Sequence, residues 1–118
     1  MDVTGKTAIV TGGARGIGRG IVMVLASNGA NVVVGDINLS DAKMVANEVA
    51  DLGRDSLVNE LDVTSQESVE RIAEETVERF GNIDILVNNA GTIGASGWEN
   101  RKRPNENDWD MIYAVNVK

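Results

Sequence analysis

The sequence contains 118 residues, a length that suits one small domain with a buried core and leaves no room for a second domain. Its apolar fraction of 42% and charged fraction of 25% are those of a soluble globular protein, and the absence of cysteine and histidine excludes disulfides, thiolate metal sites, zinc hydrolases and Ser-His-Asp enzymes. The net charge of −7 argues against nonspecific binding to nucleic acid, which depends on Lys and Arg.

The first part of the chain predicts a strand, a helix and a second strand. Residues 7–11 (TAIVT) are a continuous run of strand-forming residues, and a glycine-rich turn follows them. The predicted helix carries its apolar side chains at Ile17, Ile21 and Leu25. It ends at Gly29, and residues 31–35 (NVVVG) predict the second strand. Both strands are apolar throughout rather than alternating, which is typical of a parallel sheet covered on both faces.

The next segment predicts a second helix and a third strand. Ser40 is a suitable N-cap residue, and Gly53 follows the last helical position as a stop signal. The apolar positions of this helix are Ala42, Val45, Ala46, Val49 and Leu52. Residues 56–61 predict a third, weaker strand.

A third helix and a fourth strand follow. Thr64 and Glu67 have the spacing of a capping box, and Gly81 ends the helix. Its apolar positions are Val69, Ile72, Ala73, Val77 and Phe80. Its acidic residues lie at helical spacings and predict a solvated face; they are Glu67, Glu70, Glu74, Glu75 and Glu78. Residues 83–87 (IDILV) predict the fourth strand.

The last part of the chain predicts a long loop and one more helix. Residues 92–104 show no periodicity and contain the only proline. Asn107 is a candidate N-cap of a helix in which the chain ends, with Trp109, Ile112, Tyr113 and Val117 as its apolar positions. No apolar stretch approaches the ~20 residues that cross a bilayer, and the N-terminus lacks the pattern of a secretory signal. We therefore expect a cytoplasmic protein.

Four strands with three intervening helices predict an α/β fold. Because crossovers between parallel strands are right-handed, this order favours a doubly wound, Rossmann-like parallel sheet. The expected strand order is 3-2-1-4, and the fold would be truncated after the fourth strand and the helix that follows it. In such a sheet, ligands bind at the carboxyl ends of strands 1 and 4, where the winding reverses.

The most specific motif lies between the first strand and the first helix. Residues 11–18 (TGGARGIG) suit a tight turn, a close approach of the backbone to a pyrophosphate and close packing of the helix, all of which favour glycine. The helix N-terminus then offers unpaired N–H groups and the positive end of its dipole to the phosphates. A glycine-rich turn also forms plain strand-to-helix connections, so this interpretation depends on the flanking strand and helix.

The spacing T-G-x-x-x-G-x-G resembles the cofactor-binding region of the short-chain dehydrogenase/reductase family. Three further segments resemble motifs of that family in order and spacing: Asp62-Val63, residues 88–91 (NNAG), and Trp109 with Asn116 in the last helix. The resemblance covers essentially the whole chain. It implies that residues 1–118 form an NAD(P)-binding Rossmann-type domain, which is an incomplete domain of that family.

The resemblance assigns residues to the cofactor. Gly12, Gly16 and Gly18 would form the phosphate loop, with the backbone of Ile17 near the nicotinamide end. The residues along the ribose and the back of the nicotinamide would be Asn88, Ala90 and Gly91. Part of the role of such asparagines is to tie neighbouring strands together.

Two acidic residues would recognise the adenosine. Asp36, with Ile37 beside it, would accept hydrogen bonds from the ribose hydroxyls, and Asp62 would bind the adenine amino group with Val63 against the ring. Alternatively, Asp36 is a turn residue and Asp62 an acid flanking a helix. Asp36 would repel the 2′-phosphate of NADP, whereas Arg15 matches a basic residue of many NADP-dependent relatives. Because a carboxylate close to the 2′ position outweighs an exposed arginine, we favour NAD.

The resemblance implies hydride transfer between the nicotinamide and an alcohol or carbonyl carbon. Asn116 matches the asparagine of the family's catalytic residues, but the serine and the Tyr-x-x-x-Lys motif normally lie beyond Lys118. Tyr113 is no replacement, because Lys118 follows it after five positions and residues five apart on a helix do not share a face. We expect this chain to be the dinucleotide-binding half of an oxidoreductase, to be inactive alone and to bind no metal. Because the serine and the Tyr-x-x-x-Lys motif are absent, its classification as an enzyme stays open.

The alternative is a non-catalytic NAD-binding or self-associating module that is complete at 118 residues. The NNAG segment and Asn116 disfavour another Rossmann-like class, such as a methyltransferase. An apolar strand at 83–87 without further strands beside it would pair with another chain, so we expect a homo-oligomer or a domain-swapped dimer. A small alcohol or carbonyl substrate would bind only if the C-terminal half is supplied, and the sequence does not identify it. We expect no nucleic acid or membrane partner.

Overall fold

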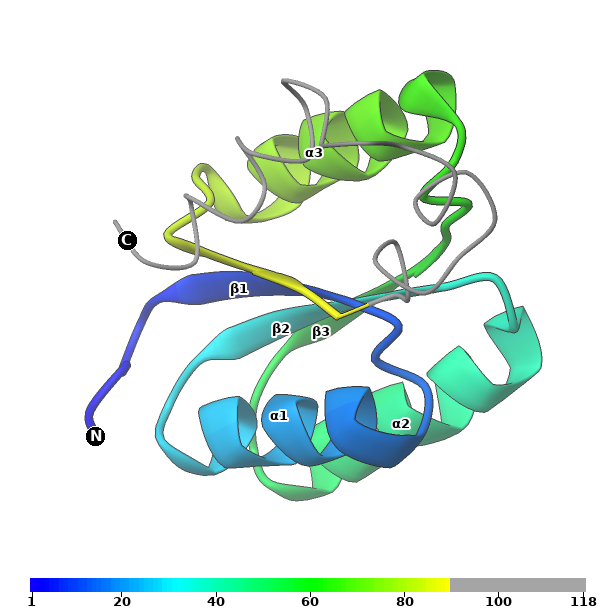
Figure 1. Cartoon of the computed structure of the whole chain (residues 1–118). Coiled ribbons are helices and arrows are strands. Elements are labelled where there is room, and N and C mark those ends of the chain that lie inside the picture. The colour runs from blue at the N-terminus through cyan, green and yellow to red at the C-terminus, as the bar shows by residue number, and fades with distance from the viewer. Residues whose placement is uncertain (90–118) are drawn as a thin grey trace, which may run out of the picture.

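The computed structural model describes residues 1–89, in which strands and helices alternate along the chain (Figure 1). The strands are β1 (Thr7–Thr11), β2 (Asn31–Asp36), β3 (Ser56–Glu60) and β4 (Ile85–Asn88), and the helices are α1 (Gly16–Ser27), α2 (Leu39–Asp51) and α3 (Gln66–Phe80). The predicted loop at 92–104 and the predicted last helix lie outside the described residues. Among helices α1 to α3, none is long and apolar enough to cross a membrane.

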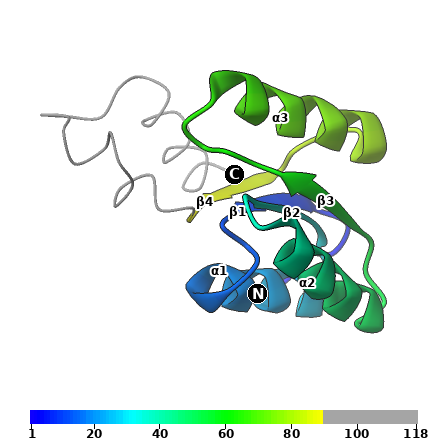
Figure 2. The same cartoon turned by 90° about the vertical axis from the view of Figure 1, so that its right-hand side faces the viewer.

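The strands form one parallel sheet in the order β3-β2-β1-β4, which confirms the predicted topology. Helices α1 and α2 cover one face of the sheet and α3 covers the other (Figure 2). The register pairs Thr11 with Gly35 on one side and with Asn88 on the other, and pairs Asp36 with Glu60. The carboxyl ends of all four strands therefore meet at one edge.

Side chains on the two faces of the central strands enter two separate apolar clusters. The cluster under α1 and α2 contains Ala8, Val10, Val32 and Val34 from the sheet. The cluster under α3 contains Ile9, Val33, Leu61 and Ile72. All five residues of β1 are buried, which confirms the interpretation of its continuous apolar run as a strand covered on both faces.

Helix α2 begins two residues earlier than predicted. Its N-cap is Asn38, whose side chain accepts a hydrogen bond of 3.1 Å from the backbone N–H of Asp41. The prediction of Ser40 as the cap is wrong, because the Asn38 side chain makes the capping bond and Ser40 is already the second residue of the helix. The helix ends before Gly53, as predicted.

Helix α3 begins one residue later than the predicted capping box. Its N-cap is Ser65, whose hydroxyl accepts a hydrogen bond of 3.2 Å from the N–H of Ser68. The prediction of Thr64 as the cap is wrong, because the Thr64 hydroxyl instead donates to the carboxylate of Asp62 at 2.6 Å. Gly81 ends the helix, as predicted.

Three residues predicted to lie on apolar helix faces are exposed: Ile17 at 78%, Leu52 at 44% and Val77 at 47%. In α1, the face against the sheet is set by Gly18 and Val22, which are one turn apart and both buried. Ile17 precedes Gly18 by about 100° around the helix and so points outward. Hydrophobic periodicity correctly placed Ile21 and Leu25 against the core but missed Gly18, because glycine carries no apolar signal.

The acidic face of α3 is largely solvated. The exposed members are Glu67, Glu70, Glu74 and Glu78, as predicted. Glu75 differs, because it is half-buried and accepts a hydrogen bond of 2.5 Å from the side-chain amide of the buried Asn59. The face therefore includes one contact that attaches α3 to β3.

Three strands differ slightly from their predicted bounds. β2 continues one residue further, to Asp36, and β3 ends at Glu60 rather than at residue 61. β4 spans Ile85–Asn88 rather than residues 83–87. Before β4, Asp84 exchanges hydrogen bonds with Thr7: the Thr7 N–H donates to the Asp84 carboxylate and the Asp84 N–H donates to the Thr7 carbonyl, both at 2.9 Å. This contact aligns the start of β4 with the start of β1.

Candidate functional site

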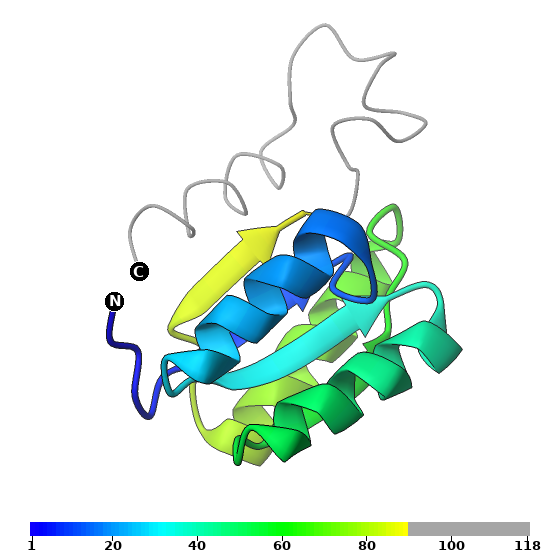
Figure 3. The same ribbon diagram turned by 90° about the horizontal axis from the view of Figure 1, so that it is seen from below.

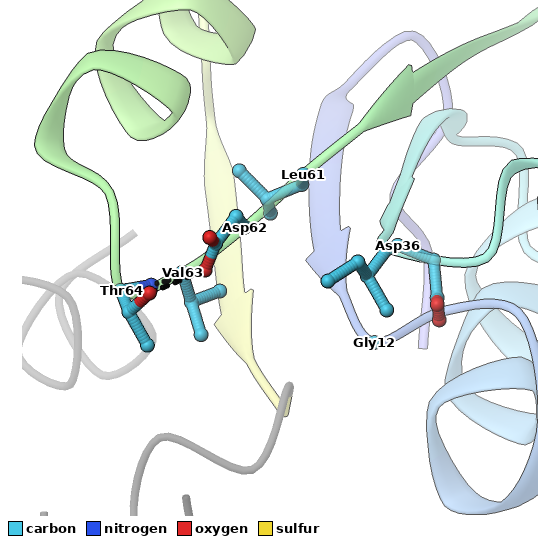
Figure 4. Close-up of a pocket in the computed structure, with 7 residues that line it drawn as sticks. Gly12, Asp36, Leu61, Asp62, Val63 and Thr64 are labelled. Atoms are coloured by element: carbon cyan, nitrogen blue, oxygen red, sulfur yellow. Dashed lines mark hydrogen bonds between the residues drawn. The ribbon is translucent and has the colours of Figure 1, made fainter. Parts of the chain in front are cut away.

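A pocket opens at the carboxyl edge of the sheet, between the ends of β1, β2 and β3 (Figure 4). Its volume is about 310 Å³, and it is lined by Gly12, Asp36, Ile37, Leu61, Asp62, Val63 and Thr64. Five of the predicted cofactor residues therefore lie together, although they come from three separate segments of the chain. The pocket combines an apolar lining with two carboxylates, which is typical of a small-molecule site.

The glycine-rich turn brings α1 against the end of β1. Gly12 and Gly16 adopt φ angles of +66° and +62°, which residues with a side chain rarely adopt. A Cβ atom on Gly18 would lie 1.9 Å from the carbonyl oxygen of Gly12 and 2.5 Å from the side-chain nitrogen of Asn89. A Cβ atom at Gly16 would meet no atom within 4 Å, so glycine is needed there for its backbone conformation. At Gly18, glycine is needed for close packing.

The N-terminus of α1 differs from those of α2 and α3. The side chain of its N-cap residue, Arg15, makes no capping hydrogen bond, and its first turn holds no acidic residue. By contrast, α2 and α3 each have a capping side chain and an acidic residue in the first turn. The first N–H groups of a helix need acceptors from outside the helix, and its dipole favours an anion there. This end of α1 therefore suits a phosphate.

The carboxylate of Asp36 is held by the backbone on both sides. One oxygen accepts a hydrogen bond of 3.1 Å from the N–H of Ala14, and the other accepts one of 2.9 Å from the N–H of Asn38. A carboxylate offers about four lone-pair sites, so both oxygens retain acceptor capacity. Asp36 thus connects the glycine-rich turn to the end of β2 and still presents acceptors to a ligand.

Asp62 lies across the pocket from Asp36, and Thr64 holds its carboxylate (Figure 4). A single oxygen of Asp62 accepts hydrogen bonds from the hydroxyl of Thr64 at 2.6 Å and from its backbone N–H at 2.9 Å. Both hydrogen bonds lower the pKa of the Asp62 carboxyl below its ordinary value, and the bond from the Thr64 hydroxyl has the larger effect. Asp62 is therefore ionised at neutral pH, and its second oxygen makes neither of these bonds.

The end of β4 is attached to the end of β1 through Thr11 and Asn89. The backbone N–H of Asn89 donates to the Thr11 hydroxyl at 2.9 Å, and the Asn89 side chain donates to the Gly12 carbonyl at 3.2 Å. The Thr11 hydroxyl also lies 3.2 Å from the side-chain oxygen of Asn88. Asn88, a predicted cofactor residue, thus lies beside the glycine-rich turn but is not among the residues that line the pocket.

The remaining predicted site residues lie around this pocket or outside the described part of the chain. Ile17 is exposed on the first turn of α1, and Ile37 is 71% exposed at the rim of the pocket. Arg15 is exposed, and its Nε lies 3.9 Å from a carboxylate oxygen of Asp41. The predicted residues that lie outside residues 1–89 are Ala90, Gly91 and Asn116.

Sequence reasoning missed the residues that hold the site together. Ala14 acts through its backbone N–H, which no sequence pattern reveals. Thr64 was detectable, because Asp-x-Thr is the signature of a turn in which the carboxylate accepts bonds from the residue two positions later. Asn89 belongs to the NNAG motif, but its contact with the Gly12 carbonyl depends on how β4 is placed beside β1.

Comparisons with known proteins agree with this architecture. A sorbitol dehydrogenase from Cereibacter sphaeroides is 40% identical over 117 residues, which cover 99% of this chain and 43% of the relative. The structure of a 7α-hydroxysteroid dehydrogenase complexed with NADH and 7-oxo glycochenodeoxycholic acid is 36% identical, with a TM-score of 0.76 over 98% of this chain and 44% of the other. An alcohol dehydrogenase from the archaeon Thermococcus sibiricus, complexed with 5-hydroxy-NADP, is 34% identical, with a TM-score of 0.66 over 69% of this chain and 35% of the other.

The chain thus spans less than half the length of these relatives. The sequence profile of the short chain dehydrogenases matches residues 6–118, which is nearly the whole chain. The chain therefore belongs to the short chain dehydrogenase family.

Proposed function

We propose that this chain binds a nicotinamide dinucleotide and supplies the cofactor-binding part of an oxidoreductase that transfers hydride between an alcohol and a carbonyl compound. The observation that carries the proposal is the placement of two carboxylates, Asp36 and Asp62, on opposite walls of one apolar pocket beside the uncapped end of α1. Such a pocket offers acceptors for the hydroxyl and amino groups of adenosine, and the helix end offers donors for its phosphates.

The adenosine half of the cofactor fits the pocket. Asp36 would accept hydrogen bonds from the ribose hydroxyls with the lone pairs that Ala14 and Asn38 leave unused. The second oxygen of Asp62, which Thr64 does not contact, would accept a hydrogen bond from the adenine amino group. Val63 and the exposed Ile37 would lie against the adenine ring, since both line the pocket with apolar surface.

The pyrophosphate would lie at the N-terminus of α1. Gly16, Ile17 and Gly18 form its first turn, and their N–H groups would donate to the phosphate oxygens. Because Gly18 packs directly on the Gly12 carbonyl, the N-terminus of α1 is held close to the carboxyl end of β1. By the family resemblance, Asn88, Ala90 and Gly91 would line the nicotinamide half.

We favour NAD over NADP because of the charge of Asp36. Its carboxylate is fixed by two backbone N–H groups, so it would not turn away from a 2′-phosphate on the ribose. A fixed like charge at that position costs binding energy that NAD avoids.

When bound, the nicotinamide ring supplies or accepts the hydride. Asn116 would take part in proton transfer, as the family resemblance implies, but the sequence contains no Tyr-x-x-x-Lys motif. A tyrosine with an ordinary pKa of about 10 needs a nearby cation to exchange a proton at neutral pH. We therefore propose that the 118-residue chain binds the cofactor without turning over a substrate by itself.

Calorimetric titration of the chain with NAD tests the proposal. Saturable binding is expected, and Asp36→Asn or Asp62→Asn should weaken it by at least about tenfold, the factor that corresponds to a hydrogen bond with a charged group. Glu60→Gln is a matched control, because Glu60 is an exposed carboxylate at the end of β3 that does not line the pocket. Equal losses in all three variants would contradict the assignment of the pocket.

A further inference from the structure

Arg15, the N-cap residue of α1, and Arg19 within α1 each pair with a carboxylate of α2. The Nε of Arg15 lies 3.9 Å from Asp41, and Arg19 donates to Glu48 through its Nε at 3.0 Å and through a second nitrogen. The two helices lie side by side on the same face of the sheet (Figure 3). The four charged residues line a shallow depression of about 210 Å³ at the outer surface of this pair. Neither arginine is therefore without a carboxylate partner.

The Arg15–Asp41 pair is connected to Asp36 through neighbouring residues. Arg15 directly follows Ala14, whose N–H donates to the Asp36 carboxylate. Asp41 is reached through Asn38, whose N–H donates to the other Asp36 oxygen and whose side chain accepts from the Asp41 N–H. Arg15 and Asp41 are thus each linked to a different oxygen of Asp36 through one intervening residue, so they would flank a ribose hydroxyl bound there.

We infer that Asp41 is a specificity-determining residue, which keeps the Arg15 guanidinium from binding a phosphate on that ribose hydroxyl. The inference rests on the proposed function, because it concerns the same adenosine site. A guanidinium pairs well with both carboxylates and phosphates, so the two compete for it. Discrimination against a 2′-phosphate then has two sources: the charge of Asp36, which repels the phosphate, and the charge of Asp41, which pairs with Arg15.

The Arg15–Asp41 pair is exposed, and its long contact limits its strength. The side chains of Arg15 and Asp41 are 74% and 37% accessible, so water and salt screen the attraction. An exposed pair of this kind corresponds to a factor of about two to five in an equilibrium constant. This factor sets the size of the effect to be measured.

The test compares the binding of 5′-AMP and 2′,5′-ADP, which differ only in the 2′-phosphate, by calorimetry at low salt. Asp41→Asn should raise the affinity for 2′,5′-ADP relative to 5′-AMP by about two- to fivefold, the range of an exposed ion pair. The gain should disappear in the double variant Arg15→Gln/Asp41→Asn. Glu48→Gln is the matched control, because it removes the same charge from α2 but releases Arg19 instead of Arg15.

Three outcomes overturn the inference. If Asp41→Asn leaves the affinity ratio unchanged while 5′-AMP still binds, Asp41 does not control specificity and the proposed function stands. If the gain persists without Arg15, or if Glu48→Gln produces it equally, the effect is a general charge effect. If neither nucleotide binds the unaltered chain, the proposed function fails and the inference fails with it. Thermal unfolding of each variant separates a loss of fold from a loss of binding.

Discussion

Gly18 packs so closely on Gly12 that a Cβ atom at Gly18 would lie 1.9 Å from the Gly12 carbonyl oxygen. This contact fixes the end of α1 against the end of β1 and so places the uncapped helix terminus beside the pocket. A Cβ atom at Gly20, two residues further along the same helix, would instead meet no atom within 4 Å. The helix therefore contains one glycine that its packing requires and another that it does not.

Gly18→Ala should destabilise the fold by at least about 2 kcal/mol, because a methyl group against a backbone carbonyl forces the helix away from the strand. Gly20→Ala should instead stabilise the fold by about 0.5–1 kcal/mol, since alanine favours a helix over glycine. Urea unfolding of the two variants checks both values. Similar free energies of unfolding for the two variants would contradict the close contact at Gly18.

Asn38→Ala should destabilise the fold by about 1 kcal/mol, because it removes the side-chain acceptor at the start of α2. Ser40→Ala should change stability by no more than a few tenths of a kcal/mol, since Ser40 lies inside the helix and is exposed. Both variants can be compared by urea unfolding. A larger loss for Ser40→Ala would favour the cap that the sequence predicts.

The pKa of the Asp62 carboxyl should rise in Thr64→Val, because this change removes the hydroxyl donor that is the main cause of its lowering. In the unaltered chain the folded state favours the ionised carboxyl. The resulting stabilisation is present above the ordinary pKa of aspartate, about 3.9, and is lost as the pH falls through the lowered value. The stability difference between the two chains should therefore be largest near neutral pH and shrink below about pH 4.

Carboxyl NMR titration measures this pKa directly and carries an internal control. Asp2 accepts equivalent hydrogen bonds from Thr4, which also lower its pKa. The Asp2 titration should be unchanged in Thr64→Val. An unchanged Asp62 titration in that variant would show that the Thr64 hydroxyl does not hold the carboxylate.

The 118-residue chain should show no dehydrogenase activity of its own. Oxidation of NADH with a panel of ketones should remain at the rate of a control without protein, since Tyr113 lacks a lysine four residues later. Activity above that control, lost in Asn116→Ala, would show that a catalytic site exists in this chain.

The strands and their order followed from the sequence because β1, β2 and β4 each contain an apolar run bounded by a glycine or a polar turn, whereas β3 gives a weaker signal. Residues 7–11 were predicted without error, and right-handed crossovers leave few arrangements of four such strands. Helix starts were predicted less well, since Asn38 and Ser40, or Thr64 and Ser65, are all good caps. Choosing between them requires the path of the chain after the preceding strand.

Five of the seven residues that line the pocket were predicted as cofactor residues, but their geometry was not predicted. Asp36 and Asp62 lie 26 positions apart, and only the parallel pairing of β2 with β3 brings the carboxyl ends of these strands to one edge. The sequence pattern could not reveal that Ala14 and Asn38 hold Asp36, because backbone N–H groups are the same at every residue except proline. The close approach of α1 to β1 was also not predicted in detail, since it depends on the absence of a side chain at Gly18.

The most direct test of the proposed cofactor site is an NMR titration of the ¹⁵N-labelled chain with NAD. We expect saturable shifts that concentrate at the amides of Gly12 to Gly18, of Asp36 and Ile37, and of Asp62 and Val63. Amides on the opposite edge of the sheet, such as those of Lys6 and Asn31, should shift little. No saturable shift at millimolar NAD, or shifts that concentrate away from the carboxyl edge of the sheet, would contradict it.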